Sequence, residues 1–185
     1  MLASTIDPAH IATVHATFEL GNKLAAAVVT GDVAHVTSIE CATMDLPCDH
    51  FGGIPSPLML ALSILLRCKE ETGLAVIETL LKRGANPLKM AELPAVRLEE
   101  PLRGEWRDGD KAIYTINALQ YFALVGDRTN EMHKRALSIL LKGQDAAQAA
   151  IYQSVFDTAT SFAEGLSMLG CAKREKTLDF NPYAK

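Results

Sequence analysis

The chain has 185 residues, 49% of them hydrophobic, and a formal net charge of -4 from 18 basic and 22 acidic side chains. This length suits one domain with a substantial core, and the lack of a basic stripe argues against nucleic acid as a partner. The longest apolar stretch, "IPSPLMLALSILL", holds two prolines and two serines and is shorter than the about 18 apolar residues that a membrane span requires, so we expect no membrane span.

The composition indicates an all-α protein. Aromatic residues make up only 6% of the chain, alanine and leucine are abundant, and runs of β-branched residues are scarce, which favours helices packed on helices. The four cysteines are irregularly spaced, which indicates reduced thiols rather than disulfides. Reduced thiols in turn indicate a cytoplasmic location. Because the start "MLASTIDPAH" has neither a basic stretch nor an apolar core, we expect no secretory signal.

The first predicted elements are an N-terminal helix and a helical hairpin. Asp7 suits the position before a helix, and Pro8 suits the first helical residue. Val14 and Phe18 lie on one face of this helix, and we expect Gly21 to end it. The following stretch, "NKLAAAVVTGDVAHVTSIECATMD", contains two apolar runs separated by Thr-Gly-Asp, which is typical of a helical hairpin.

A second hairpin is predicted in "SPLMLALSILLRCKEETGLAVIETLLKRGANPL", residues 56–88. Pro57 stands where the first turn of a helix tolerates proline. Leu80 and Leu81 belong to the apolar face of the second helix, and we expect both to fill the layer between neighbouring hairpins. Gly84 is predicted to end this helix as a C-terminal cap.

Residues 89–111 are polar and contain two prolines and two glycines, and they show no sustained helical or strand period. We therefore predict a long excursion there. A third hairpin follows in "INALQYFALVGDRTNEMHKRALSILLKGQDA", with a break at Gly126. Apolar residues from Ile151 to Leu169 then recur at steps of three and four, which predicts a terminal helix or tight helix pair before a polar tail that starts at Lys173.

The three hairpins share a polar start, a leucine two positions later and a glycine that we expect to separate the two helices. This pattern resembles the ankyrin repeat, in which "SPLMLA" stands for T-P-L-H-x-A and "VIETLLKRGANP" for the second helix and its closing turn. Asn22 and Ser56, the first two starts, lie 34 residues apart, close to the roughly 33-residue ankyrin period. The equivalent glycines are Gly31, Gly73 and Gly126.

This resemblance implies one domain over residues 1–185, built as a short ankyrin-like solenoid of helical hairpins. An N-terminal cap helix would occupy residues 1–20, about three repeats residues 21–145, and a C-terminal cap helix and tail residues 146–185. The chain departs from the family signature where Met59 and Gln120 replace its histidine and Phe122 replaces its small alanine. We interpret it as a divergent, irregular member.

The resemblance also implies a non-enzymatic module that binds another protein through its hairpin tips and first-helix faces. The single tryptophan, Trp106, lies in the polar excursion, where it would serve either as an interface anchor or as a plug for the loop. The positions that match the family's variable surface are Val29, Thr30, His50, Phe51, Ser63, Ile64, Tyr114, Leu124 and Val125.

No motif for a catalytic centre, cofactor or metal site is found. Cys41, Cys48 and His50 are the only close Cys/His group, and they lack the paired spacing of a zinc site. His15 has a possible ligand four residues on, at Glu19, but two ligands do not make a site. The chain has no Gly-rich phosphate loop, G-x-S-x-G or H-E-x-x-H motif. We therefore expect no catalytic residues, no cofactor and no metal.

Two further readings stay open. A short, acidic ankyrin-like domain also suits a bacterial or viral effector acting in the host cytosol, or an immunity protein that masks a toxin. The alternative from another class is an enzyme whose site is formed by the charged side chains of residues 89–111, which are Arg97, Glu99, Arg103, Glu105 and Asp108.

Overall fold

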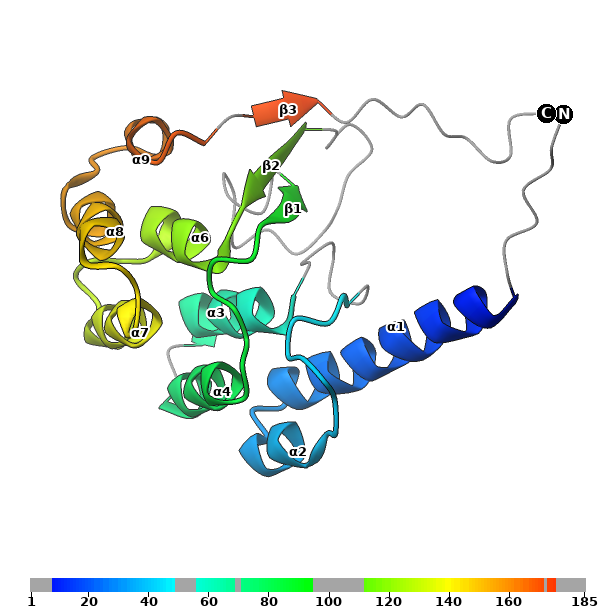
Figure 1. Ribbon diagram of the computed structural model, residues 1–185. Coiled ribbons are helices and arrows are strands. Elements are labelled where there is room, and N and C mark those ends of the chain that lie inside the picture. Colours follow the sequence, from blue (N-terminus) through cyan, green and yellow to red (C-terminus); the bar gives the residue numbers. More distant parts are fainter. Residues whose placement is uncertain (1–7, 49–55, 69–70, 95–111, 172, 176–185) are drawn as a thin grey trace, which may run out of the picture.

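The computed structural model describes residues 8–48, 56–68, 71–94, 112–171 and 173–175 (Figure 1). These ranges are predominantly helical, as expected from the composition, and they also contain a small antiparallel sheet. The helices are α1 (Pro8–Val29), α2 (Val33–Ser38), α3 (Pro57–Cys68), α4 (Glu71–Lys82), α6 (Ala118–Val125), α7 (Glu131–Leu141), α8 (Ala146–Thr158) and α9 (Phe162–Met168), and the strands are β1 (Ala91–Pro94), β2 (Ala112–Ile116) and β3 (Lys173–Glu175).

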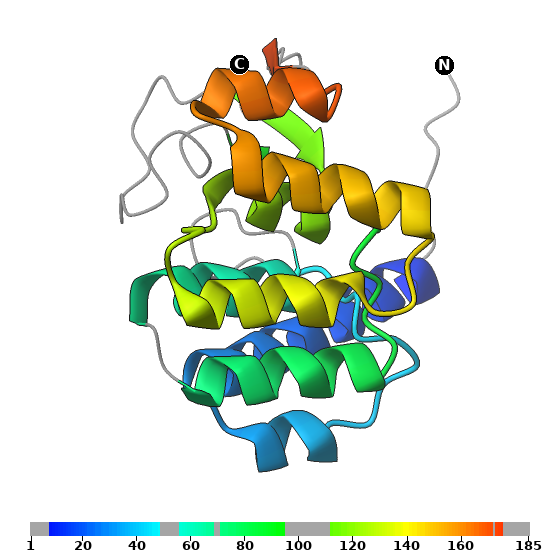
Figure 2. The same ribbon diagram turned by 90° about the vertical axis from the view of Figure 1, so that its left-hand side faces the viewer.

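Six of these helices form hairpins that stack in two rows. The pairs α1–α2, α3–α4 and α6–α7 each fold back on themselves, at the three places that the sequence predicts. The first helices pack α1 on α3 and α3 on α6, while the second helices pack α2 on α4 and α4 on α7. Figure 2 shows the second-helix row, with α2, α4 and α7 one above another. Each hairpin thus covers the apolar face that its neighbour cannot bury alone.

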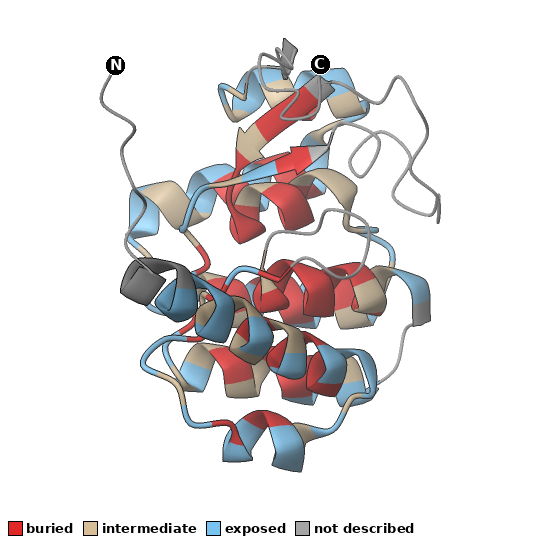
Figure 3. Ribbon diagram, turned by 90° about the vertical axis from the view of Figure 1, so that its right-hand side faces the viewer, coloured by how far each residue is buried: buried red, intermediate tan, exposed pale blue. Residues whose placement is uncertain are grey.

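The core lies inside this stack (Figure 3). α3 is its centre, because Pro57 to Leu62 are all buried and Leu65 is only 1% exposed. A small residue, Ala61, is 2% exposed where α3 lies between α1 and α6, which lets the first helices approach closely. The largest fully buried side chains are Phe122, Leu24, Met44, Leu58, Met59, Leu62, Leu65, Ile77, Leu80, Leu93, Ile116 and Leu119.

Local signals in the sequence place most helix ends. Asp32 caps α2 by accepting a hydrogen bond from the backbone N–H of His35 at 2.8 Å. Asn117 and Gln120 form a reciprocal capping box at the start of α6. At the end of α4, Gly84 has a φ of 90°, its N–H donates to the carbonyl oxygen of Leu81, and the next N–H donates to that of Leu80. This is a Schellman motif, so the predicted cap at Gly84 is confirmed.

Gly21 does not end a helix, so the prediction of a helix end at this glycine is wrong. α1 is continuous for 22 residues and passes through this glycine. A Cβ at Gly21 would lie 2.0 Å from the carbonyl oxygen of Pro47. The glycine is therefore needed for a close contact with the loop after α2, not for a turn.

Gly73 is also misplaced by the sequence pattern. It lies within the first turn of α4 rather than between the two helices of the hairpin, since α3 ends at Cys68 and α4 begins at Glu71. A Cβ there would lie 3.2 Å from Cδ1 of Leu65 on α3. This glycine therefore sits at a close approach of the two helices of one hairpin.

The sheet has the order β1-β2-β3, with β2 in the centre and both pairings antiparallel. β1 lies within residues 89–111, so the expectation of an excursion without strands is wrong at 91–94. Pro94 is tolerated because β1 is an edge strand. The central strand, "AIYTI", is rich in β-branched and aromatic residues, a strand signal that the helical interpretation overlooked.

The C-terminal part is a helix pair followed by a strand. Both α8 and α9 pack on α6, and α9 also packs on α8. Phe122 of α6 stacks on Phe156 of α8, with ring centroids 6.4 Å apart, and meets the ring of His133 on α7 edge-on at 5.7 Å. Phe122 thus joins the third hairpin to this pair. The tail predicted from Lys173 begins with β3.

Among the helices of the described ranges, none is both long and apolar enough to cross a membrane.

Candidate binding groove

Two of the predicted surface residues are buried, which corrects their assignment to a binding face. Ser63 on α3 is 5% exposed and Tyr114 on β2 is 3% exposed. The ring of Tyr114 meets Phe162 of α9 edge-on, with centroids 6.1 Å apart. A partner that leaves the fold intact cannot reach either side chain, because α3 and β2 are covered on both sides by neighbouring elements.

The other described members of the predicted surface differ in exposure. Val29 is 42% exposed at the end of α1, and Thr30 beside it is exposed. The Thr30 hydroxyl donates to the carbonyl oxygens of Ala26 and Ala27, so it serves the helix end. Ile64, Leu124 and Val125 are half-buried and pack against the core.

Three predicted binding residues, His50, Phe51 and Trp106, lie outside the described residues. So do Arg97, Glu99, Arg103, Glu105 and Asp108, on which the enzyme alternative depends. Of the first helices, α3 and α6 expose little, since five of the eight residues of α6 are buried and the other three half-buried, whereas α1 is exposed along much of its length. A surface for a partner has to be sought elsewhere on the stack.

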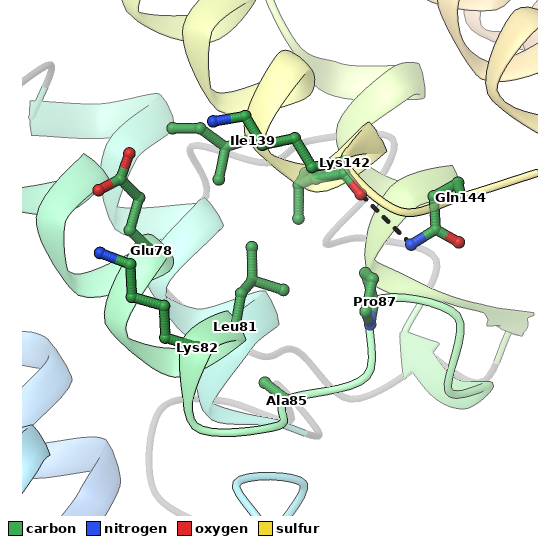
Figure 4. A pocket seen from close by; sticks show the side chains of 9 residues that line it. Glu78, Leu81, Lys82, Ala85, Pro87, Ile139, Lys142 and Gln144 are labelled. Atoms are coloured by element: carbon green, nitrogen blue, oxygen red, sulfur yellow. Dashed lines mark hydrogen bonds between the residues drawn. The ribbon is translucent and has the colours of Figure 1, made fainter.

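A groove of about 450 Å³ opens on the second-helix row, between the C-terminal halves of α4 and α7 (Figure 4). It lies over the junction of the second and third hairpins. Its lining comes from α4, from the turn that follows it and from the end of α7: Glu78, Leu81, Lys82, Ala85, Pro87, Ile139, Leu140, Lys142 and Gln144.

The floor of the groove is apolar. Ala85 and Pro87 are buried, and they lie in the turn after the Schellman motif at Gly84, where they line the groove. Leu81 and Ile139 are half-buried from opposite helices, so each keeps part of its side chain facing outward. The prediction that both leucines fill the layer between hairpins holds fully for Leu80, which is 0% exposed, whereas Leu81 packs only partly against the core and also lines the groove.

The rim of the groove is polar. Lys82 is the last residue of α4 and Lys142 the C-cap of α7, and both are exposed. Figure 4 shows Glu78 and Lys82 together on the α4 wall, with Lys142 on the α7 wall. Gln144 closes one end, where its side-chain N–H donates to the carbonyl oxygen of Leu140 at 3.5 Å. Lysines at helix C-termini also interact favourably with the helix dipole.

The sequence contains a signal for this groove that the repeat comparison passed over. The triplet Leu-Leu-Lys occurs at the end of α4, at 80–82 in "LLKRG", and again at the last two residues and C-cap of α7, at 140–142 in "LLKGQ". Because α4 and α7 pack side by side, the repeated triplet brings one buried leucine, one half-buried leucine and one exposed lysine from each helix to the same end of the row. The repeated triplet can be seen in the sequence, but the groove depends on how α4 and α7 align.

Within the part of the chain that the structure describes, no group of three or more His, Cys, Asp or Glu side chains is placed to hold a metal ion. Cys48 is buried and Cys41 half-buried, and neither forms a disulfide. Burial raises the pKa of the Cys171 thiol. A raised pKa lowers the thiolate fraction at neutral pH, so this cysteine is a poor nucleophile.

No family model matches this chain, and neither a curated protein nor a solved structure matches it.

Proposed function

We propose that the chain is a non-enzymatic protein-binding module, built as a short ankyrin-like solenoid. The stacking of three hairpins, first helix on first helix and second on second, supports this architecture. In this proposal the N-terminal half of α1 and the pair α8–α9 act as the caps, since they adjoin the first and last hairpins of the row. The ankyrin resemblance supplies the function, because stacked repeats offer extended surfaces rather than enclosed pockets.

The observation that carries the proposal is the groove between α4 and α7. It is open, apolar at its floor and polar at its rim, which is the usual anatomy of a surface that binds another protein. The first-helix faces of α3 and α6 are almost wholly buried. We therefore place the partner on the second-helix row, not on the first-helix face that the resemblance implies.

The location belongs to the same proposal. Cys41, Cys48 and Cys171, the cysteines that the structure describes, form no disulfide, which supports a reducing compartment such as the cytosol. If the protein is a secreted effector, this compartment is the cytosol of the host cell.

Selection from a displayed library of random dodecapeptides against the full chain tests this function. We expect selected peptides to lose binding to Leu81→Glu and Ile139→Glu, because a carboxylate in an apolar floor is costly to desolvate. Both side chains are half-buried, so the variants should fold, which a thermal melt checks. Ala150→Glu, on the exposed surface of α8, is the matched control and should bind as the wild type does.

Selected peptides that bind both groove variants as well as they bind the wild type would show that the groove is not the binding surface. Failure to select any peptide that depends on the groove would remove the support for the proposed function.

A further inference from the structure

The groove is lined by more positive than negative side chains. Two ammonium groups, of Lys82 and Lys142, and one carboxylate, of Glu78, line it. The chain as a whole carries a net charge of -4. The groove is thus a locally positive site on an acidic protein.

Neighbouring basic side chains on the second-helix row form hydrogen bonds or ion pairs within the chain. Arg83 donates to carbonyl oxygens at the end of α2, including that of Ile39 at 2.6 Å. Arg135 of α7 pairs with Glu71 of α4 at 2.7 Å, and Lys134 pairs with Glu131 at 2.6 Å.

Lys82 and Lys142 differ from these cations. Neither ammonium group makes an ion pair or hydrogen bond with another residue of the described ranges. They flank the apolar floor from opposite helices, so a single bound segment can meet both (Figure 4). Their ammonium groups are therefore free to pair with groups from outside the chain.

We propose that the groove binds an acidic segment of a partner protein, in which carboxylates flank an aliphatic side chain. This inference rests on the proposed function and adds the chemistry of the partner. The aliphatic side chain packs on Leu81 and Ile139, and the flanking carboxylates pair with Lys82 and Lys142. A volume of about 450 Å³ is large enough for a short segment, since sites of about 300 to 1,000 Å³ hold compact ligands.

Charge complementarity decides between an acidic occupant and a basic one. A basic segment would place its cations beside two lysines and could use only Glu78. An acidic segment meets two opposite charges and one like charge. Glu78 is half-buried on the α4 wall, so it also disfavours a third carboxylate at that place.

The test uses two synthetic peptides with blocked ends, Ser-Glu-Leu-Asp-Ile-Glu-Ser and its neutral counterpart Ser-Gln-Leu-Asn-Ile-Gln-Ser. Each is titrated into the full, ¹⁵N-labelled chain, and the backbone amide signals are followed by NMR. We expect the acidic peptide to shift the amides of Leu81, Lys82, Ile139 and Lys142 in a saturable way. Raising the salt concentration should weaken this binding, because exposed ion pairs are screened.

The double variant Lys82→Gln, Lys142→Gln should bind the acidic peptide about fivefold more weakly, the size expected for two exposed ion pairs. Lys134→Gln removes a charge from the exposed surface of α7 outside the groove and should leave the affinity unchanged. If the double variant is less stable than the wild type, the salt dependence of the wild type alone still decides the matter.

Equal binding of both peptides, with no effect of salt, would overturn the acidic specificity and leave the protein-binding groove standing. Shifts confined to other surfaces, or no shifts with the acidic peptide, would also overturn the inference. The proposed function is tested by a different experiment, the selection from the peptide library, and is contradicted if no selected peptide depends on the groove.

Discussion

The guanidinium group of Arg83, the residue after α4, donates a hydrogen bond to the carbonyl oxygen of Ile39 at 2.6 Å, although the two residues are 44 positions apart in the sequence. A second nitrogen of the same group donates to the carbonyl oxygen of Val36. Both acceptors belong to the end of α2, whose last carbonyls have no partner within the helix. One side chain therefore caps the second helix of one hairpin from the second helix of the next.

Arg83→Ala should destabilise the protein by about 1.5 kcal/mol or more, because it removes two charge-assisted hydrogen bonds between hairpins. The stability of Arg83→Lys should lie between those of the wild type and Arg83→Ala, because an ammonium group lacks the planar fork of a guanidinium. The control is Arg135→Ala, which breaks an exposed ion pair with Glu71 and should cost at most about 1 kcal/mol. Urea denaturation measures all three, and equal losses for Arg83→Ala and Arg135→Ala would contradict the capping role.

Gly21→Ala should destabilise the protein by about 1 to 3 kcal/mol, even though alanine is the better helix former. The added Cβ would lie 2.0 Å from the carbonyl oxygen of Pro47, so backbone has to move. Gly73→Ala is the matched helical control, because its Cβ would make its one tight contact with the flexible end of the Leu65 side chain, 3.2 Å from Cδ1. Thermal melts should show a clear loss for the first and a small change for the second. Similar changes in both would mean that the Pro47 contact is unimportant.

Leu80→Ala should cost about 2 to 5 kcal/mol, as expected for a fully buried leucine that leaves a cavity. Leu81→Ala should cost clearly less, because Leu81 is half-buried and already faces the groove. The pair differs by one position in the same helix, so helix propensity cancels in the comparison. Denaturant unfolding with a common m-value is the measurement, and a larger loss for Leu81→Ala would reverse the assignment of the two side chains.

Glu164 gives a prediction for the pH dependence of α9. Its carboxylate accepts hydrogen bonds from the backbone N–H of Thr160 at 2.8 Å and from the Thr160 hydroxyl at 2.7 Å. The backbone bond, followed by the hydroxyl, holds the pKa of Glu164 below its ordinary value. A lowered pKa in the folded state means that this contribution to stability is present at neutral pH and is lost as the pH falls through the folded-state pKa.

An NMR titration of the Glu164 carboxyl group should therefore show a midpoint below that of an unfolded control. Thr160→Ala keeps the backbone N–H and removes the hydroxyl, so the midpoint should move part of the way back up. The Thr160 amide signal should follow the same transition in the wild type. A midpoint that is unchanged in Thr160→Ala would show that the hydroxyl bond is not formed in solution.

The sequence by itself determined where hairpins form. Each hairpin depends on signals between residues that are close in the chain: leucines at helical spacing, Asp32 and Asn117 as caps, and Gly84 as the residue that adopts a positive φ. Such signals act before any tertiary contact is made, so they can be read without a structure. The lysines that line the groove were equally visible, in two repeats of Leu-Leu-Lys before a glycine.

Tertiary structure decided the rest, because the deciding contacts join residues far apart in sequence. Gly21 looked like a helix end, but a loop carbonyl at Pro47 requires it inside a helix. The pairing of β1 with β2 created a strand from four residues with little strand character of their own. Burial removed Ser63 and Tyr114 from the expected binding face. The alignment of α4 against α7 made a groove from side chains about 60 positions apart, which no local propensity encodes.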